Sequence, residues 1–334
     1  MPETSLKCGH KARTGAIPSP GLAVPAAGQI ITDDRGISGM GEYRIGVDVG
    51  GTKVAYGLFD GQNHLLDRYE HPSPLDIDGP GISDLVIGGI RQVAERNRLK
   101  LEDLEGVGVC MPSYILFDEG YIFLTSALTN IRDFAMGPYL EARLPGVAVV
   151  LDNDSNCAAL AEHRYGAGRG CRDLVYMSVS TGLGSGLILN GELFRGSYGW
   201  AGETGHMLIT PDQGLECGCR NKGCFMSWSS GRFFPEHARA MGRKYPTAMD
   251  LEAGVNGRTL LEACKAGDPA AMAVLEQSAY YIGLCVYNIW QVLNVKTYVF
   301  GGGLVHFGDM LFDRVRAVFD RYNHVDVPVD FKTA

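Results

Sequence analysis

Long apolar runs, a positive net charge and a regular repeat are all missing from this sequence. No run of about 18 apolar residues occurs, which excludes a membrane-spanning helix. The 334 residues carry a formal net charge of −8, which argues against nucleic acid as the main partner because phosphates need a positive surface. The 45 glycines follow no period, so a collagen-like chain is excluded. A soluble α/β protein with two domains remains, and its glycines indicate tight turns open to ligands.

The nine cysteines do not make a disulfide scaffold in a chain of this length. Such usage suits a reducing compartment, so we expect a cytoplasmic protein. Three of them lie close together in the sequence, at Cys217, Cys219 and Cys224. The other six are predicted to be small buried hydrophobic residues: Cys8, Cys110, Cys157, Cys171, Cys264 and Cys285.

Residues 1–42 differ from the rest, because prolines interrupt their only apolar stretch. We expect a disordered tail or a start site assigned too early. From Tyr43 onward the pattern is regular. Strands are predicted at 44–50, 53–60, 65–69, 106–111, 147–151, 174–180 and 297–300. Helices are predicted at 82–96, at 155–165 and from Asp268 to about Asn294.

A strand followed by a glycine turn and a hairpin occurs once in each half, predicting domains at 43–152 and 153–334. The first turn reads Asp48-Val49-Gly50-Gly51-Thr52-Lys53. The second reads Thr181-Gly182-Leu183-Gly184-Ser185-Gly186. Backbone N–H groups in such turns bind anions, and a carboxylate at the strand end can hold Mg²⁺. Each turn alone could be a plain hairpin, but two in matching places favour a nucleotide held between the domains.

Asn153 and Asp154 follow a predicted strand and begin a predicted helix. Asx residues there most often cap the helix. A carboxylate at the same place can instead act as a general base toward a substrate hydroxyl. The two interpretations are compatible if one residue caps and the other reacts.

His206 and the sequence Cys217-Gly218-Cys219, with Cys224 after it, offer one imidazole and three thiolates. This donor set is typical of a closed, structural zinc site. Unpaired cysteines in a glycine-rich loop are the alternative interpretation. A redox pair is less favourable, because a Cys-x-Cys disulfide is a strained ring. A nucleic-acid zinc ribbon is disfavoured by the acidic charge and the single knuckle.

Taken in order, these motifs and Glu203-Thr204-Gly205-His206 resemble the ROK family (repressor, open reading frame, kinase). That family contains glucokinases, N-acetylmannosamine kinases, allose kinases and sugar-responsive repressors. The resemblance implies an α/β fold of two actin-like (ribonuclease H-like) domains with an interdomain cleft for sugar and ATP. It implies ATP- and Mg²⁺-dependent phosphorylation of a hydroxyl on a hexose or hexose derivative.

The resemblance also implies roles for individual residues. Asp154 is the expected base. The expected sugar-binding residues are Asn130, Asn153, Glu203 and His206. The expected nucleotide-binding residues are Asp48, Gly50, Gly51, Thr52, Lys53, Thr181, Gly182, Gly301 and Gly302. The expected ligands of a structural Zn²⁺ are His206, Cys217, Cys219 and Cys224.

Three features depart from the family pattern. Met226 stands where the family has a glutamate that contacts the anomeric end of the sugar, which argues against glucose more than against kinase chemistry. Ser113 stands where many members have glycine. The sequence ends at Ala334, short of the family's usual last strand and helix, so we expect a truncated chain.

The main alternative function is a non-catalytic sugar sensor or a transcriptional repressor. A repressor needs a winged helix-turn-helix of about 60–80 residues, which residues 1–42 are too short to supply. A sensor is expected to lack the base, yet Asp154 is present. An acetate kinase-type or chaperone-type ATPase leaves Glu203, His206 and the cysteines unexplained. We therefore expect a sugar as partner, and neither nucleic acid nor a membrane. A homodimer or homotetramer is implied only by the resemblance, because many family members form one and no residue pattern here decides it.

Overall fold

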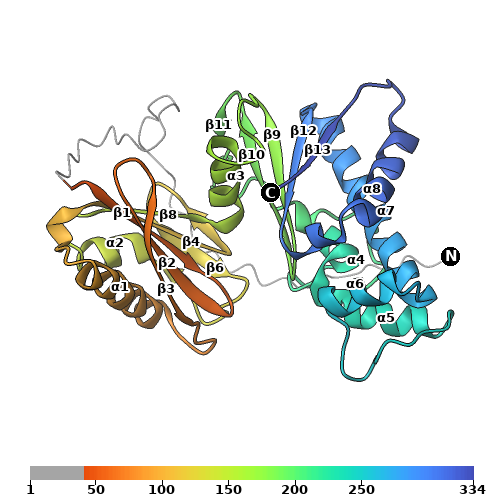
Figure 1. Cartoon of the computed structure of the whole chain (residues 1–334), viewed down its shortest axis with the longest axis horizontal. Helices are drawn as coiled ribbons and strands as arrows, with labels where there is room; N and C mark the ends of the chain where they lie inside the picture. Colours follow the sequence, from red (N-terminus) through yellow and green to blue (C-terminus); the bar gives the residue numbers. More distant parts are fainter. Residues whose placement is uncertain (1–40) are drawn as a thin grey trace, which may run out of the picture. The chain divides into compact units, whose positions relative to one another are not determined.

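Two five-stranded sheets with the same strand pattern are the framework of the protein (Figure 1). The computed structural model describes residues 41–334. The expectation of a disordered tail or misassigned start falls on residues that lie, except for Gly41 and Glu42, outside the described part.

The first sheet has the strand order β3-β2-β1-β4-β8. Its strands are β1 (Tyr43–Val49), β2 (Lys53–Phe59), β3 (Leu65–Pro72), β4 (Leu104–Met111) and β8 (Ala148–Asn153). The first three strands form antiparallel hairpins, as predicted, while β4 and β8 run parallel to β1. Alternate residues of β1 are buried, because successive side chains of a strand point to opposite faces.

Two helices and a small sheet complete the first half. The helices are α1 (Gly79–Arg96) and α2 (Met136–Glu141), and a short 3₁₀ helix spans Leu101–Asp103. Asp78 caps α1 by accepting a hydrogen bond from the backbone N–H of Gly81. The small antiparallel sheet, which the sequence did not predict, contains β5 (Ser113–Leu116), β6 (Tyr121–Thr125) and β7 (Arg132–Phe134).

The second sheet repeats the order and directions of the first as β11-β10-β9-β12-β13. Its strands are β9 (Leu174–Val179), β10 (Leu183–Leu189), β11 (Glu192–Leu193), β12 (Thr297–Gly301) and β13 (Asp330–Thr333). All five residues of β12 are buried, as expected for a central strand covered on both faces. The final residues form β13, which pairs in parallel with β12. The absence of the family's usual last strand and helix stays a prediction.

Three long helices cover the second sheet. They are α3 (Asp154–Arg164), α7 (Pro269–Leu293) and α8 (Asp309–Tyr322). One core contains α7 and α8 with one face of the sheet, and a smaller core joins Ala159 of α3 to Leu174, Tyr176 and Val299. The carboxylate of Asp268 caps α7 as predicted, and Asn294 ends the helix in the left-handed conformation.

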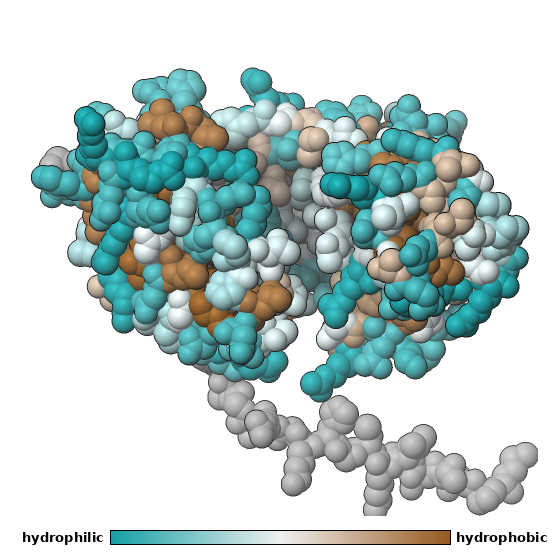
Figure 2. Space-filling view, turned by 60° about the horizontal axis from the view of Figure 1, so that its bottom comes forward, coloured by the Kyte–Doolittle hydropathy of each residue, from teal (hydrophilic) through white to brown (hydrophobic). Residues whose placement is uncertain are grey.

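The other regular elements of the second half are short helices. They are α4 (Phe225–Ser229), α5 (Phe234–Gly242) and α6 (Gly257–Lys265), with 3₁₀ helices η2 (Thr204–His206), η3 (Gly231–Phe233) and η4 (Gly303–Phe307). The surface of the protein is mostly hydrophilic on the face that Figure 2 shows, and its hydrophobic residues form separate patches there. Within residues 41–334, no helix is long and apolar enough to cross a membrane.

Candidate active site and metal-binding cluster

Asp154 stands where the last strand of the first sheet passes into the first helix of the second half. Its neighbour Asn153 is the N-cap of α3, with Oδ1 accepting from the backbone N–H of Ser155 at 2.8 Å. The Nδ2 atom of Asn153 donates to the carbonyl of Ser113 at 3.1 Å. Asp154 Oδ1 also accepts from the Ser155 N–H, at 2.9 Å. Asn153 therefore has the capping role, and Asp154 is the carboxylate available for chemistry.

The surroundings of Asp154 favour its protonated form more than water does. Burial raises the pKa of its carboxyl group, and the negative charge of Asp48 raises it further, against hydrogen bonds from Ser155. Burial also raises the pKa of Asp48, although Cys110 and Lys53 oppose this. A carboxylate whose pKa is moved up toward neutrality is a better proton acceptor for a hydroxyl group.

Glu203 belongs to the same electrostatic group. Burial raises the pKa of Glu203 to about 7, a hydrogen bond with Tyr114 lowers it, and the charge of Asp154 raises it. Sequence reasoning missed Tyr114, whose only signal was its place beside Ser113. The aromatic ring of Tyr114 also packs edge-on against Trp200, with ring centroids 5.5 Å apart. The structure thus brings β5 to the segment that contains Glu203.

Two half-buried cysteines lie near these carboxylates. The Sγ of Cys110 on β4 is 3.7 Å from Oδ1 of Asp48, and a hydrogen bond with Cys157 of α3 raises the pKa of the Cys110 thiol. The prediction of buried cysteines is confirmed for Cys264 and Cys285. It is wrong for Cys110 in β4, Cys157 in α3 and Cys171 in the loop before β9, which are only partly buried. Cys8 lies outside the described residues.

The first glycine turn is a tight connection between β1 and β2. The backbone N–H of Gly50 donates to the carbonyl of Lys53 at 2.9 Å, so this group is used within the turn. Gly51 and Thr52 form the tip of the turn, where Thr52 is exposed. The Nζ of Lys53 lies 3.0 Å from Glu70 on β3. Asp48, at the end of β1, is accessible to solvent.

The second glycine turn lies beside the glycines that follow β12. Thr181 and Gly182 are exposed at the β9–β10 turn, where the Ser180 N–H donates to the Gly182 carbonyl at 3.0 Å. Gly302 has φ of +86°, and a Cβ atom there would lie 2.6 Å from the Val179 carbonyl oxygen. Glycine is therefore required at this position. Across residues 41–334, no hydrogen bond joins the first turn to this second group.

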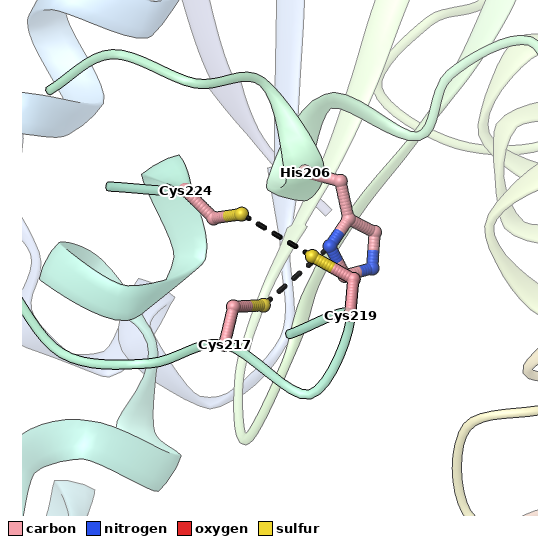
Figure 3. A group of neighbouring side chains, drawn as sticks. All are labelled: His206, Cys217, Cys219 and Cys224. Atoms are coloured by element: carbon pink, nitrogen blue, oxygen red, sulfur yellow. Dashed lines mark hydrogen bonds between the residues drawn. The ribbon is translucent and has the colours of Figure 1, made fainter. Parts of the chain in front are cut away.

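The four residues predicted to bind zinc form one compact cluster, and Figure 3 shows their side chains pointing toward one another. All four donor atoms lie within 4.8 Å of one another. His206 Nδ1 is 3.5 Å from the Sγ of Cys217, and the Sγ atoms of Cys219 and Cys224 are also 3.5 Å apart. Burial and the neighbouring thiols raise the pKa of Cys224 to about 12. Three thiolates can share such a volume only when a cation balances them.

The backbone builds this cluster from three short segments. His206 ends η2, Cys217 and Cys219 lie in a loop, and Cys224 precedes α4. The loop closes as a knuckle, in which the Arg220 N–H donates to the Cys217 carbonyl and the Cys217 N–H donates to the Asn221 carbonyl, both at 2.8 Å. Nδ1 of His206 faces the sulfur atoms, which leaves Nε2 on the opposite side of the ring.

The ROK family model matches residues 44–330 of the chain. The chain belongs to the ROK family. The glucokinase of Halalkalibacterium halodurans is 30% identical over 289 residues, which are 84% of this chain and 86% of that protein. The xylose repressor of Bacillus spizizenii is 26% identical over 277 residues, which are 82% of this chain and 68% of the repressor.

A solved structure with the same architecture is that of a ROK family glucokinase from Streptomyces griseus in complex with glucose and AMPPNP. Its TM-score is 0.74 at 28% identity, with 87% of this chain and 94% of that chain covered. The predicted fold class, an α/β protein with two actin-like domains, is confirmed.

Two ROK-type positions remain to be located. Asn130 is exposed, and its Nδ2 atom donates to Asp76 at 2.6 Å, so its described partner is a carboxylate of the first half. Met226 is the second residue of α4 and packs against the core of the second sheet. Neither residue has a described contact with Asp154 or Glu203. Both are placed in the sugar site only by the expectation from the family.

Proposed function

We propose that this ROK protein transfers the γ-phosphoryl group of ATP to a hydroxyl of a hexose or hexose derivative. The observation that carries the proposal is the position of Asp154, a carboxylate with a raised pKa at the start of α3. The charges of Asp48 and Glu203 act at the same place, since each enters the electrostatic balance of this small group. A sugar kinase needs one proton acceptor and little other side-chain chemistry.

The proposed reaction uses Asp154 as the general base. Its carboxylate accepts the proton of the sugar hydroxyl as that oxygen bonds to the γ-phosphorus, and the bond between γ-phosphorus and the bridging oxygen breaks to leave ADP. Glu203 and Nε2 of His206 hold neighbouring sugar hydroxyls. Asn153 caps α3 and so orients the residue that follows it.

Nucleotide binding is assigned to the two glycine turns. Thr52, Thr181 and Gly182 are exposed and, with Gly51 beside them, fit the phosphates, while Gly301 and Gly302 are assigned to the adenosine. Asp48 is an accessible oxygen ligand at a strand end and fits Mg²⁺, which neutralises phosphate charge when bound. The resemblance implies Lys53 at this site, but its described partner is Glu70, and we propose no direct contact with the nucleotide for it.

We assign a structural zinc ion to His206, Cys217, Cys219 and Cys224. Tetrahedral Zn–S bonds of about 2.3 Å place sulfur atoms nearly 4 Å apart, which fits the spacing of this cluster. The donor set is closed, so zinc would act by fixing the ring of His206. We further propose that the enzyme is cytoplasmic, in line with its glucokinase relatives. We also propose that the end of the sugar that faces Met226 carries few polar groups.

A sugar-responsive regulator is the second candidate, because the matched relatives include a xylose repressor. Release of ADP from MgATP separates the two functions. The panel should contain glucose, mannose, fructose, allose, N-acetylglucosamine and N-acetylmannosamine, with Asp154→Asn as the blank. Turnover above this blank on any sugar supports the kinase. Calorimetric binding of a sugar without turnover on all six supports the regulator.

A further inference from the structure

The carboxylate of Asp152 is the most heavily hydrogen-bonded acid next to the proposed base. Asp152 is only 4% exposed, at the end of β8. Its Oδ1 accepts from the backbone N–H of Asn153 at 2.7 Å and from Nδ2 of Asn156 at 2.9 Å. Its Oδ2 accepts from Nε and Nη2 of Arg195 at 3.0 and 2.9 Å. Both oxygens are therefore occupied, and the orientation of the carboxylate is fixed.

Arg195 connects this carboxylate to a different part of the chain. It follows β11 in the second half, and its guanidinium lies 3.7 Å from the ring centroid of Phe117, in the turn between β5 and β6. The backbone carbonyl of Arg195 accepts from the Ala201 N–H at 3.0 Å, which closes the loop that ends just before Glu203. At the other end of this loop, the backbone carbonyl of Gly202 accepts from the Ser185 N–H of β10 at 2.9 Å.

The loop closed by Arg195 fits closely against both halves. A Cβ atom at Gly199 would lie 2.2 Å from the carbonyl oxygen of Ile115 on β5. A Cβ atom at Gly202 would lie 2.1 Å from the carbonyl oxygen of Ser185. The segment 195–202 therefore has little freedom to shift while Arg195 is in place.

We propose that Asp152 and Arg195 form a positioning pair that holds the turn of Asp154 and the segment of Glu203 in one fixed arrangement. The positioning role itself does not depend on the proposed function; only its expected effect on catalysis does. The side chain of Asp152 fixes the N–H at the start of the Asp154 turn, while the backbone of Arg195 anchors the loop that leads to Glu203. Removing the guanidinium leaves a buried, unpaired carboxylate, which must rearrange. Both segments then lose their support together.

Hydrogen exchange of the sugar-free protein tests this coupling without any need for activity. The variant is Arg195→Gln. The matched control is Arg172→Gln, whose exposed guanidinium binds Asn190 at the other end of the same hairpin. We expect exchange in peptides covering 150–157 and 194–204 to accelerate together by at least about tenfold in Arg195→Gln. Unchanged exchange in 150–157, although Arg195 is gone, would overturn the proposal.

Steady-state kinetics then test the consequence for catalysis. At a temperature where circular dichroism shows a folded protein, we expect Arg195→Gln to lower kcat by at least about tenfold and to raise the KM for sugar. Arg195→Lys should restore part of both. A purely structural role would lower Tm while leaving kcat and KM within about twofold of the wild type, and this outcome would also overturn the proposal.

Two controls keep the test decisive. If Arg195→Gln does not fold, the double variant Asp152→Asn/Arg195→Gln removes the unpaired charge and is measured in its place. If the wild type turns over no sugar, the proposed kinase function fails, while the exchange experiment still decides whether the pair couples the two segments.

Discussion

The two five-stranded sheets have the same order and the same strand directions, but the ends of their first strands differ in chemistry. In the first sheet, Asp48 pairs across from Cys110 on the next parallel strand. At the matching place of the second sheet, Ser178 pairs across from Gly301. One turn thus offers a charged oxygen ligand, whereas the other offers bare backbone and hydroxyls. The two sheets therefore have the same architecture, but the residues at their strand ends suit different roles in ligand binding.

The connections after these strands differ even more. The first half places the small sheet β5-β6-β7 between β4 and α2. The second half has a long insertion after β11, which contains Glu203 and the His206–cysteine cluster. Several of the candidate functional residues therefore lie in a loop of the second half. Tyr114 and Phe117 in the first half are placed to contact those loops.

The largest effect is expected where the two halves join. Asp154→Asn should lower kcat by about a thousandfold or more, because the amide cannot accept the hydroxyl proton. Sugar affinity by calorimetry should change by less than about threefold, since the cap made by Asn153 is untouched. Turnover near the wild-type rate would remove Asp154 from the mechanism.

The next experiment compares equivalent positions of the two sheets. Asp48→Asn should lower kcat/KM for MgATP by about 100-fold, because it removes the proposed oxygen ligand of Mg²⁺. Ser178→Ala, at the matching position, should change the same quantity by less than about threefold. Equal losses in both variants would mean that the sheets share the metal-binding task.

Much of this comparison could be predicted from the sequence. The short apolar runs predicted β1, β2, β4, β8, β9 and β12, because central strands are buried on both faces. The capping pair at Asp268 and Pro269 correctly predicted the start of α7. The hairpin β5-β6 was missed because Tyr114, Phe123 and their neighbours bury themselves through aromatic contacts with Trp200, without a simple alternation of polar and apolar residues.

The candidate site also contains some features that the sequence predicted and others that it could not predict. The cysteine spacing correctly predicted a four-residue cluster, since its donors lie close in sequence. Tyr114 and Arg195 could not be predicted, because their partners Glu203 and Asp152 are distant in the chain. Three of the scattered cysteines were wrongly predicted to be buried, since an apolar local context does not reveal how closely the rest of the chain packs against a side chain.

Loss of the metal cluster should have a smaller effect, confined to the second half. Cys219→Ser should bind less zinc by elemental analysis and raise the KM for sugar by about tenfold, because the ring of His206 loses its fixed orientation. The KM for MgATP should stay within about twofold, since both glycine turns are separate from the cluster. A wild-type protein without zinc would contradict the metal assignment.

The pH dependence of sugar binding should be several-fold. The pKa of Glu203 is raised from 4.5 to about 7, so its carboxylate is largely protonated below that pH. The ionised form accepts hydroxyl hydrogen bonds, and the KM for sugar should therefore fall as pH rises from about 6 to about 8. The same shift lowers folding stability as pH rises from about 4.5 to about 7, because over this range the folded state retains a proton that the unfolded state has released.

Glu203→Gln should remove this dependence of KM on pH. Tyr114→Phe should instead move its midpoint upward, because the tyrosine hydrogen bond lowers the pKa of Glu203. A midpoint that stays in place in Tyr114→Phe would show that the phenol does not act on this carboxylate.

The smallest effect is expected at the one lysine of the first turn. The Nζ of Lys53 is paired with Glu70, and both side chains are about half exposed. Exposed pairs contribute about 0–1 kcal/mol, so Lys53→Ala should shift Tm by no more than a few degrees. If Lys53 stays with Glu70 during turnover, the KM for MgATP should remain within about threefold. A tenfold rise, with Glu70→Gln unchanged, would show that Lys53 leaves its partner to bind phosphate, and the contrast in charge between the two turns would then be greater than the strand ends alone indicate.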